Sequence, residues 1–379
     1  MIGLIEIILL SVLVICFIIQ MIFYWIVLAK PYYYMQSVKK GNIRFIGNYP
    51  PVSVIIYVKN RFYDLQNFLP AILEQDYPQF EVIIINDEIT EKNKNTLFRL
   101  QAQYENLYFT NIPDETRNVS REKLGLTLGI KAAKYDCLLF TEADSHTRSN
   151  NWIRLMARHF GKNKTVVLGM SAKEEENSFF RKFISYDYFF SNLQKLSMAL
   201  FNHPYAGIGR NLLYSKTQYN EQKGYVRHHS RRRVEADLFI NNIVAESDAK
   251  VELSPESVIM TDLNTYDWKQ EKINKTFTNR FYKAGPVVLG SLEFFSGFFF
   301  IISVISCFII SYLNPQAWPY VFGLASGCYL TRLLSQLFVI NKTASSLELK
   351  KYYLTVPLFD FMQMMSNIYF FMYRFVRKK

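Results

Sequence analysis

The chain has 379 residues, of which 50% are hydrophobic and 16% aromatic, with 44 Lys and Arg against 32 Asp and Glu. This composition excludes an intrinsically disordered chain, a collagen-like repeat and a small disulfide scaffold, and the length allows two or three structural units. Most charged residues fall in the middle of the chain, whereas both ends are strongly apolar. The pattern predicts a soluble domain flanked by membrane segments.

The first 29 residues predict a membrane anchor. The run from Leu4 to Leu28 is almost wholly apolar and exceeds the roughly 20 residues that a span requires. A cleaved signal peptide would begin with basic residues and have a shorter apolar core. Residues 1–29 are therefore interpreted as an uncleaved N-terminal transmembrane anchor.

Strands and helices alternate through the charged domain, residues 30–283. The apolar pattern predicts four strands separated by three helices, in the order 52–58, 63–74, 80–85, 91–104, 107–112, 119–133 and 137–141. This alternation predicts an α/β fold with a mostly parallel, Rossmann-like sheet flanked by helices. A broad apolar stripe over 178–201 predicts a further helix that packs in the core, with contact to the membrane interface as the alternative.

The C-terminal region, 284–379, predicts further membrane helices. Two apolar runs, at about 287–313 and 320–340, are long enough to span a bilayer and are joined closely enough to form a helical hairpin. A last stretch, 352–376, contains polar residues such as Asp360. It either spans the membrane or lies in the interface, and the interface is slightly favoured.

Basic residues predict the orientation of the chain. Lys and Arg follow the first span, precede the second and follow the third. Because cytoplasmic loops carry an excess of these residues, the domain over 30–283 is expected in the cytoplasm. The four cysteines show neither metal-ligand spacing nor a disulfide framework, which agrees with a reducing compartment.

Carboxylates follow two of the predicted strands. Asp87 comes just after the strand at 80–85, and Glu142 and Asp144 follow the strand at 137–141. Ligands bind at the carboxyl ends of parallel strands, where two carboxylates one residue apart suit Mg²⁺ or Mn²⁺ held against a diphosphate. A turn or helix cap would explain any one of them alone. Their joint position favours a ligand site.

In combination these motifs resemble bacterial membrane-anchored family 2 glycosyltransferases, which have the GT-A fold. The matching stretches run in order through about 50–275, at 52–56, 74–87, 118–121, 126–133, 141–144, 207–212 and 237–239. The resemblance implies an inverting transfer from a nucleoside-diphosphate sugar, with Mg²⁺ or Mn²⁺ as cofactor.

The resemblance also implies roles for single residues. Asp87, Glu142 and Asp144 match the nucleotide-binding acids, and Glu142 and Asp144 match the pair that holds the metal. Glu235 falls at the position of the catalytic base, and Asp237 matches the acid two places on. On the acceptor side it places Gly207, Gly209, Arg210 and Trp268.

Several positions depart from the family pattern. Glu142 and Glu235 stand where Asp is usual, Arg61 stands where an acid is usual, and Asn274 takes the place of an arginine in the late motif. Glu for Asp moves a carboxylate by about one methylene, and a misplacement near 1 Å can lower a rate by roughly 10²-fold. A nearby lysine could replace the arginine only as a point charge.

Two functions follow from these features. The first is an inverting membrane glycosyltransferase of the bacterial inner membrane that adds a single sugar to a membrane-proximal, for example lipid-linked, glycan of the cell envelope. The alternative is a non-catalytic family member that binds a nucleotide sugar or a partner transferase. The retained carboxylates favour the first, and the altered late motif favours the second. Both imply contact with the lipid bilayer, and neither implies a nucleic-acid partner.

Overall fold

The structure is a computed structural model that describes residues 4–376, except 48, 88–89, 114–119, 162–164, 175–177, 223–234, 263, 280–281 and 315–317. The chain divides into two compact units. One comprises Ser37–Tyr282, and the other combines Met1–Gln36 with Lys283–Lys379.

The unit over Ser37–Tyr282 is an α/β domain. Its strands are β1 (Val52–Val58), β2 (Phe80–Asn86), β3 (Leu107–Asn111), β4 (Cys137–Glu142), β5 (Ser145–Thr147), β6 (Thr165–Gly169), β7 (Ser171–Lys173), β8 (Leu212–Ser215), β9 (Asp248–Glu252) and β10 (Ile259–Thr261). Its helices are α3 (Phe62–Leu73), α4 (Glu91–Gln103), α5 (Arg121–Ala132), α6 (Trp152–Ala157), α7 (Phe179–Leu200), α8 (Lys216–Glu221), α9 (Glu235–Glu246) and α10 (Thr265–Thr278), with a short 3₁₀ turn at Pro255–Ser257.

Seven strands form one mixed sheet in the order β3-β2-β1-β4-β8-β6-β9. The pairs β3–β2, β2–β1, β1–β4 and β6–β9 are parallel, and β8 runs antiparallel to both of its neighbours. A separate sheet of three short strands has the order β5-β10-β7. The predicted α/β class, with a mostly parallel sheet flanked by helices, is confirmed.

The central strands are apolar because both faces of the sheet are covered. Val54, Ile55 and Ile56 of β1 are fully buried, and parallel strands buried on both faces are expected to be continuous apolar runs. Gly129 of α5 allows this helix to pack closely on the sheet, since a Cβ there would lie 2.6 Å from the side chain of Ile85. These contacts fix the strand ends from which the site is built.

Helix α7 packs in the core of the domain, as the apolar stripe predicts. Phe183, Ile184, Phe189 and Leu193 are buried, whereas Phe179 at the start of the helix is about half exposed. The sequence analysis predicted β1, β2, β3 and β4 and the helices α3, α4, α5 and α7 of this domain. It did not predict the strands from β5 to β10, and it did not predict the helices α2 (Lys30–Lys39), α6, α8 and α10.

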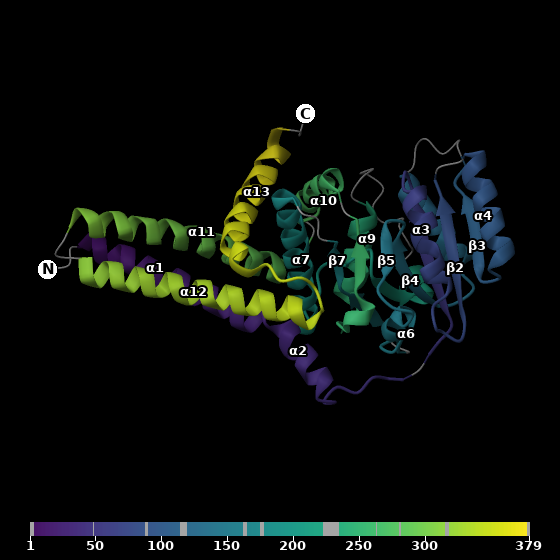
Figure 1. The fold of residues 1–379 in the computed structure, drawn as a ribbon, viewed down its shortest axis with the longest axis horizontal. Coiled ribbons are helices and arrows are strands. Elements are labelled where there is room, and N and C mark those ends of the chain that lie inside the picture. Colours follow the sequence, from purple (N-terminus) through teal and green to yellow (C-terminus); the bar gives the residue numbers. More distant parts are fainter. Residues whose placement is uncertain are drawn as a thin grey trace. The chain divides into compact units, whose positions relative to one another are not determined.

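The other unit is helical. It contains α1 (Leu4–Ile22), a π-helical turn at Phe23–Leu28, the start of α2, and then α11 (Ala284–Leu313), α12 (Trp318–Ser346), a 3₁₀ turn at Tyr353–Thr355 and α13 (Val356–Val376). Figure 1 shows α1, α11 and α12 side by side, with α13 running across them. Three described helices are long and apolar enough to cross a membrane, at Leu4–Lys39, Ala284–Leu313 and Pro319–Ser346.

Apolar and polar contacts both hold the helical unit together. Leu13, Phe300 and Val321 belong to a buried apolar cluster shared by α1, α11 and α12. Beside it, Arg332 of α12 forms an ion pair of 2.8 Å with Asp360 of α13. The predicted stretch 352–376 forms a helix, α13, over Val356–Val376. The Arg332–Asp360 pair joins the first turns of α13 to α12.

Candidate active site

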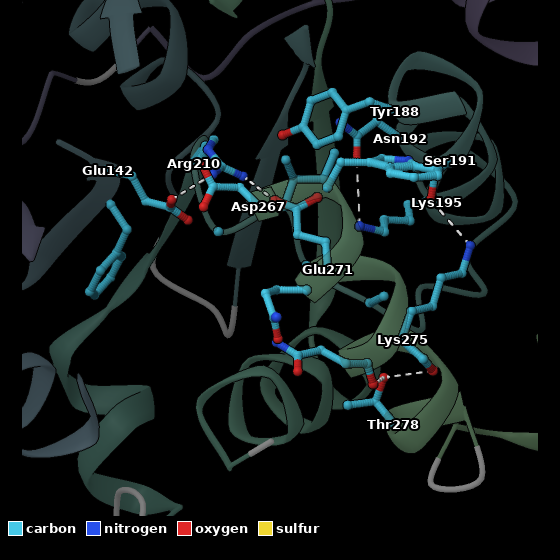
Figure 2. A pocket seen from close by; sticks show the side chains of 18 of the residues that line it. Glu142, Tyr188, Ser191, Asn192, Lys195, Arg210, Asp267, Glu271, Lys275 and Thr278 are labelled. Atoms are coloured by element: carbon cyan, nitrogen blue, oxygen red, sulfur yellow. Dashed lines mark hydrogen bonds and ion pairs between the residues drawn. The ribbon is translucent and has the colours of Figure 1, made fainter. Parts of the chain in front are cut away.

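A pocket of about 490 Å³ opens at the carboxyl ends of β1 and β4. The end of β4, the loop before β8, and helices α7 and α10 supply most of its wall. Figure 2 shows Glu142 and Arg210 directed toward each other on one side of the pocket, and Lys195 and Lys275 on the opposite side. A pocket at this position agrees with the general rule for open α/β sheets.

The acid pair after β4 faces this pocket. Glu142 is the last residue of β4, and Asp144 lies between β4 and β5. The Asp144 side chain is 4% exposed and accepts a hydrogen bond of 3.1 Å from the Thr261 hydroxyl, whereas the Glu142 side chain is 47% exposed. The strand end thus presents one buried and one accessible carboxylate.

Arg210 joins the two carboxylates of the pair. Its Nη2 atom lies 2.8 Å from Glu142, and its Nε atom lies 3.4 Å from Asp144. On the other side its Nη1 atom lies 2.5 Å from Glu271 of α10. Burial opposes ionisation of Asp144, but the Arg210 guanidinium outweighs it and lowers the pKa of Asp144. Asp144 is therefore a carboxylate at neutral pH.

The glycine loop places Arg210 through its neighbour Asn211. The Asn211 side chain is buried, donates 2.9 Å hydrogen bonds to the Met170 and Ser257 carbonyls and accepts one of 3.0 Å from the Trp152 indole. Gly169 packs so closely on it that a Cβ there would lie 2.3 Å from Asn211. The sequence analysis overlooked Asn211, although a polar residue inside the loop motif 207–212 was a usable signal.

Both predicted glycines line the pocket. The Gly207 amide donates a 3.2 Å hydrogen bond to Asn241 of α9, and a Cβ on Gly209 would lie 3.9 Å from Glu142. Glu235 is the first residue of α9, and Asp237 lies in its first turn. Their side chains lie outside the part of the structure that is described. Among the described side chains of α9, Asn241, six residues after Glu235, lines the pocket.

Asp87 lies beneath the pocket rather than in its described lining. Its side chain is 1% exposed, accepts a hydrogen bond of 2.5 Å from the Tyr57 hydroxyl and pairs with Arg121. Lys59 lies 3.7 Å away. Tyr57 and Lys59 do line the pocket, so Asp87 is one side chain removed from it. The structure brings together Glu142, Asp144 and Arg210, and it places Asp87 behind Tyr57.

Trp268 is held by a buried carboxylate of α7. Asp187 accepts a 2.7 Å hydrogen bond from the Trp268 indole and a 2.6 Å hydrogen bond from Lys272. The Trp268 ring also makes edge contacts with Phe180 and Phe183. Trp268 lines the pocket, but most of its ring is buried. The sequence analysis did not identify Asp187, because it lies inside an apolar helix stripe.

The donor set of the acid pair fits a divalent cation. Among the described residues no group of three or more His, Cys, Asp and Glu side chains could hold a metal ion. Mg²⁺, however, is commonly bound by one or two carboxylates together with substrate phosphates. Glu142 and Asp144 already face one positive charge, the guanidinium of Arg210. Their oxygens are hard ligands of the kind that Mg²⁺ and Mn²⁺ prefer.

Comparison with known proteins gives a consistent result. Residues 53–221 match the model of glycosyl transferase family 2. A mannosyltransferase from Pyrobaculum calidifontis, solved with GDP-Man and Mn²⁺, is similar in fold with a TM-score of 0.50 and 15% identity, over 95% of this chain and 99% of that chain. S. aureus TarS has a TM-score of 0.42 and 13% identity, over 85% and 89%. No curated protein matches the sequence.

Proposed function

On the premise that residues 53–221 form a family 2 glycosyltransferase domain of the GT-A fold, we propose that the protein transfers one sugar from a nucleoside-diphosphate sugar to a glycan acceptor with inversion. One observation carries the proposal. The acid pair Glu142 and Asp144 ends β4 at the rim of a pocket that the glycine loop borders. Ligands of α/β sheets bind at this edge.

The donor side of the pocket suits a diphosphate. Glu142 and Asp144 would hold Mg²⁺ or Mn²⁺, which when bound neutralises negative charge on the diphosphate. Arg61 and Lys59 line the same part of the pocket and add positive charge near the leaving group. Asp87 would act on the nucleotide through Tyr57 and Lys59, because its own carboxylate is buried.

The acceptor side supplies the base. In an inverting displacement the acceptor oxygen bonds to the anomeric carbon while the bond from that carbon to the diphosphate oxygen breaks. Glu235, at the start of α9, would take the acceptor proton, and Asp237 would support it. A carboxylate within hydrogen-bond reach is sufficient for this role. Trp268, Gly207 and Gly209 would border the acceptor.

The location follows from the helical unit. Three helices of membrane-spanning length support a multi-pass protein of the bacterial inner membrane, with the catalytic domain in the cytoplasm. A membrane-proximal or lipid-linked glycan of the cell envelope is then the accessible acceptor. A reporter fused at residue 283 should behave as cytoplasmic, and one in the joint 314–317 as external. An external reading at residue 283 would refute this orientation.

A donor screen tests the activity. Full-length protein in detergent is incubated with a panel of nucleoside-diphosphate sugars and an envelope glycolipid extract, with and without Mn²⁺, and release of nucleoside diphosphate is measured. The parent should release product from at least one donor, and Asp144→Asn should not. Glu256→Gln is the matched control, since Glu256 is an exposed acid outside the pocket lining.

A second candidate is a non-catalytic member that binds a nucleotide sugar or a partner transferase. It is favoured by the pairing of Glu142, Asp144 and Glu271 with Arg210, which leaves no carboxylate of this group without a cation. Donor binding without release of nucleoside diphosphate from any donor would select this candidate over the first.

A further inference from the structure

Arg210 occupies the position between the two carboxylates that the proposed metal would need. The guanidinium contacts Glu142 and Asp144 through Nη2 and Nε, and its own side chain is only 9% exposed. An arginine does not lose its charge at any physiological pH. The acid pair therefore carries a resident positive charge before any donor arrives.

The same guanidinium has a second partner across the pocket. Nη1 lies 2.5 Å from Glu271, whose side chain is 39% exposed, and the ring of Tyr188 lies 6.0 Å from the guanidinium carbon. The backbone beside Arg210 is fixed, because the Asn211 amide and carbonyl are hydrogen-bonded to Ile208 and Gly169. Arg210 can consequently leave the acid pair only by rotating its side chain, and Glu271 is a partner that it keeps.

The geometry points to Arg210 as a built-in competitor of the divalent metal. Arg210 holds Glu142 and Asp144 while the donor is absent, and it would have to release both before they could hold a metal. Glu271, which already pairs with Nη1, would keep the displaced guanidinium. The guanidinium and a divalent cation would thus compete for the same two acidic side chains. The inference rests on the proposed donor site and adds a control on when that site accepts metal.

Two substitutions should change metal affinity in opposite directions. Arg210→Gln removes the competitor and leaves like charges facing each other, so Mn²⁺ should bind about tenfold or more tightly, as expected for loss of a close charge pair. Glu271→Gln removes the partner that would hold the displaced guanidinium, so release of the acid pair by Arg210 becomes less favourable. Mn²⁺ should then bind more weakly than to the parent.

A double variant distinguishes an indirect role of Glu271, through Arg210, from direct coordination of the metal by Glu271. If Glu271 acts only through Arg210, Glu271→Gln should have no effect in the Arg210→Gln background. If Glu271 were itself a metal ligand, the same change would weaken Mn²⁺ binding in both backgrounds. That second outcome would overturn the assigned role of Glu271.

The experiment measures Mn²⁺ affinity by electron paramagnetic resonance of the free ion, on full-length protein in detergent and without nucleotide. Arg210→Lys keeps a positive charge at this position but only as a point charge, so its Mn²⁺ affinity should lie between those of the parent and Arg210→Gln. Because it retains the buried charge, it is less prone to misfold than Arg210→Gln. Lys250→Gln removes a lysine that pairs with Asp248 outside the described pocket lining, and should leave Mn²⁺ affinity near the parent value. Thermal unfolding confirms that each variant is folded.

The outcomes distinguish this inference from the proposed function. Equal Mn²⁺ affinity in the parent, Arg210→Lys and Arg210→Gln would overturn the inference, while binding of a nucleoside diphosphate with Mn²⁺ to the parent would leave the donor site standing. If no protein of the series binds Mn²⁺, even with a nucleoside diphosphate present, the metal-assisted donor site is wrong and the competition falls with it.

Discussion

Arg332 of α12 and Asp360 of α13 form an ion pair of 2.8 Å in which the two side chains are 4% and 3% exposed. Gln20 of α1 accepts a 3.0 Å hydrogen bond from Arg332, and Gln336 donates one of 3.0 Å to Asp360. The network thus links three helices of the helical unit. Buried charges among membrane helices are expensive to leave unpaired.

Breaking this pair should destabilise the helical unit. Arg332→Met leaves the Asp360 carboxylate buried without its cation, and removal of one partner of a buried pair lowers stability by about 3–5 kcal/mol. The measurement is thermal unfolding of the purified protein in detergent. Lys342→Met is the control, since Lys342 is exposed on the same helix. Arg332→Met/Asp360→Leu should recover most of the loss, and failure to recover would contradict a specific pair.

Glu235→Gln should reduce sugar transfer by about 10² or more, the usual range for loss of a general base. Donor binding and folding should be unchanged, because the substitution keeps the size of the side chain. Glu235→Asp should retain activity, since Asp is the usual residue of the family at this position. The measurement is the rate of nucleoside-diphosphate release. A parent-like rate in Glu235→Gln would move the base to Asp237.

Asp87→Asn and Asp144→Asn should both weaken binding of a nucleoside diphosphate with Mn²⁺, but for different reasons. Asp144 faces the pocket, whereas Asp87 holds Tyr57 and Arg121 in place. Tyr57→Phe should therefore weaken nucleoside-diphosphate binding, but less than Asp87→Asn does. Unlike Asp144→Asn, it should not lower the Mn²⁺ affinity. Calorimetry with and without metal gives both quantities. Unchanged affinity in both Asn variants would contradict the donor site.

Glu252 should contribute stability that is lost in acid. Burial opposes its ionisation, but His159 and Arg158, at 2.8 and 2.7 Å, outweigh burial and lower the pKa of Glu252. A carboxyl whose folded-state pKa is depressed stabilises the fold above its unfolded pKa, about 4.3, and this contribution disappears as pH falls through the folded pKa. The contribution is therefore full at neutral pH.

The measurement compares thermal unfolding of the parent and Glu252→Gln at neutral pH and below pH 4. The difference between them should be large at neutral pH, where the variant leaves Arg158 without its buried partner, and should shrink in acid. Glu256→Gln, an exposed acid on the following turn, should show little difference at either pH. If the difference in unfolding temperature between the parent and Glu252→Gln stayed constant with pH, the ion pair would be excluded as the source of that difference.

Much of the fold could be predicted from local pattern. The strand at 52–58 was predicted with its observed limits, because a strand buried on both faces is a continuous apolar run between breakers. The strands β5, β7 and β10 have three residues each and are partly polar. They are too short to show the alternation of apolar and polar residues by which a strand is recognised. Helix α2 lacks the apolar periodicity from which helices such as α3 and α7 were predicted.

The acid pair of the site could also be predicted, since strand ends are visible in the sequence. The guanidinium between the two carboxylates could not, because Arg210 and Asp144 lie 66 residues apart and come together only when β8 pairs with β4. The same holds for Asp187 and Trp268, which meet only after α7 and α10 pack together. Contacts of this kind depend on tertiary structure rather than on spacing.

The buried network of the helical unit also bears on how the protein is made. In the proposed topology Arg332 reaches the membrane during synthesis ahead of Asp360, which follows 28 residues later, and a central arginine disfavours insertion by about 2.5–3.5 kcal/mol. Gln20, which is already in place, offers its amide oxygen as an interim partner for that guanidinium. The glutamine of the first helix would thus assist biogenesis, and its loss should lower the yield of inserted protein more than the stability of the finished one.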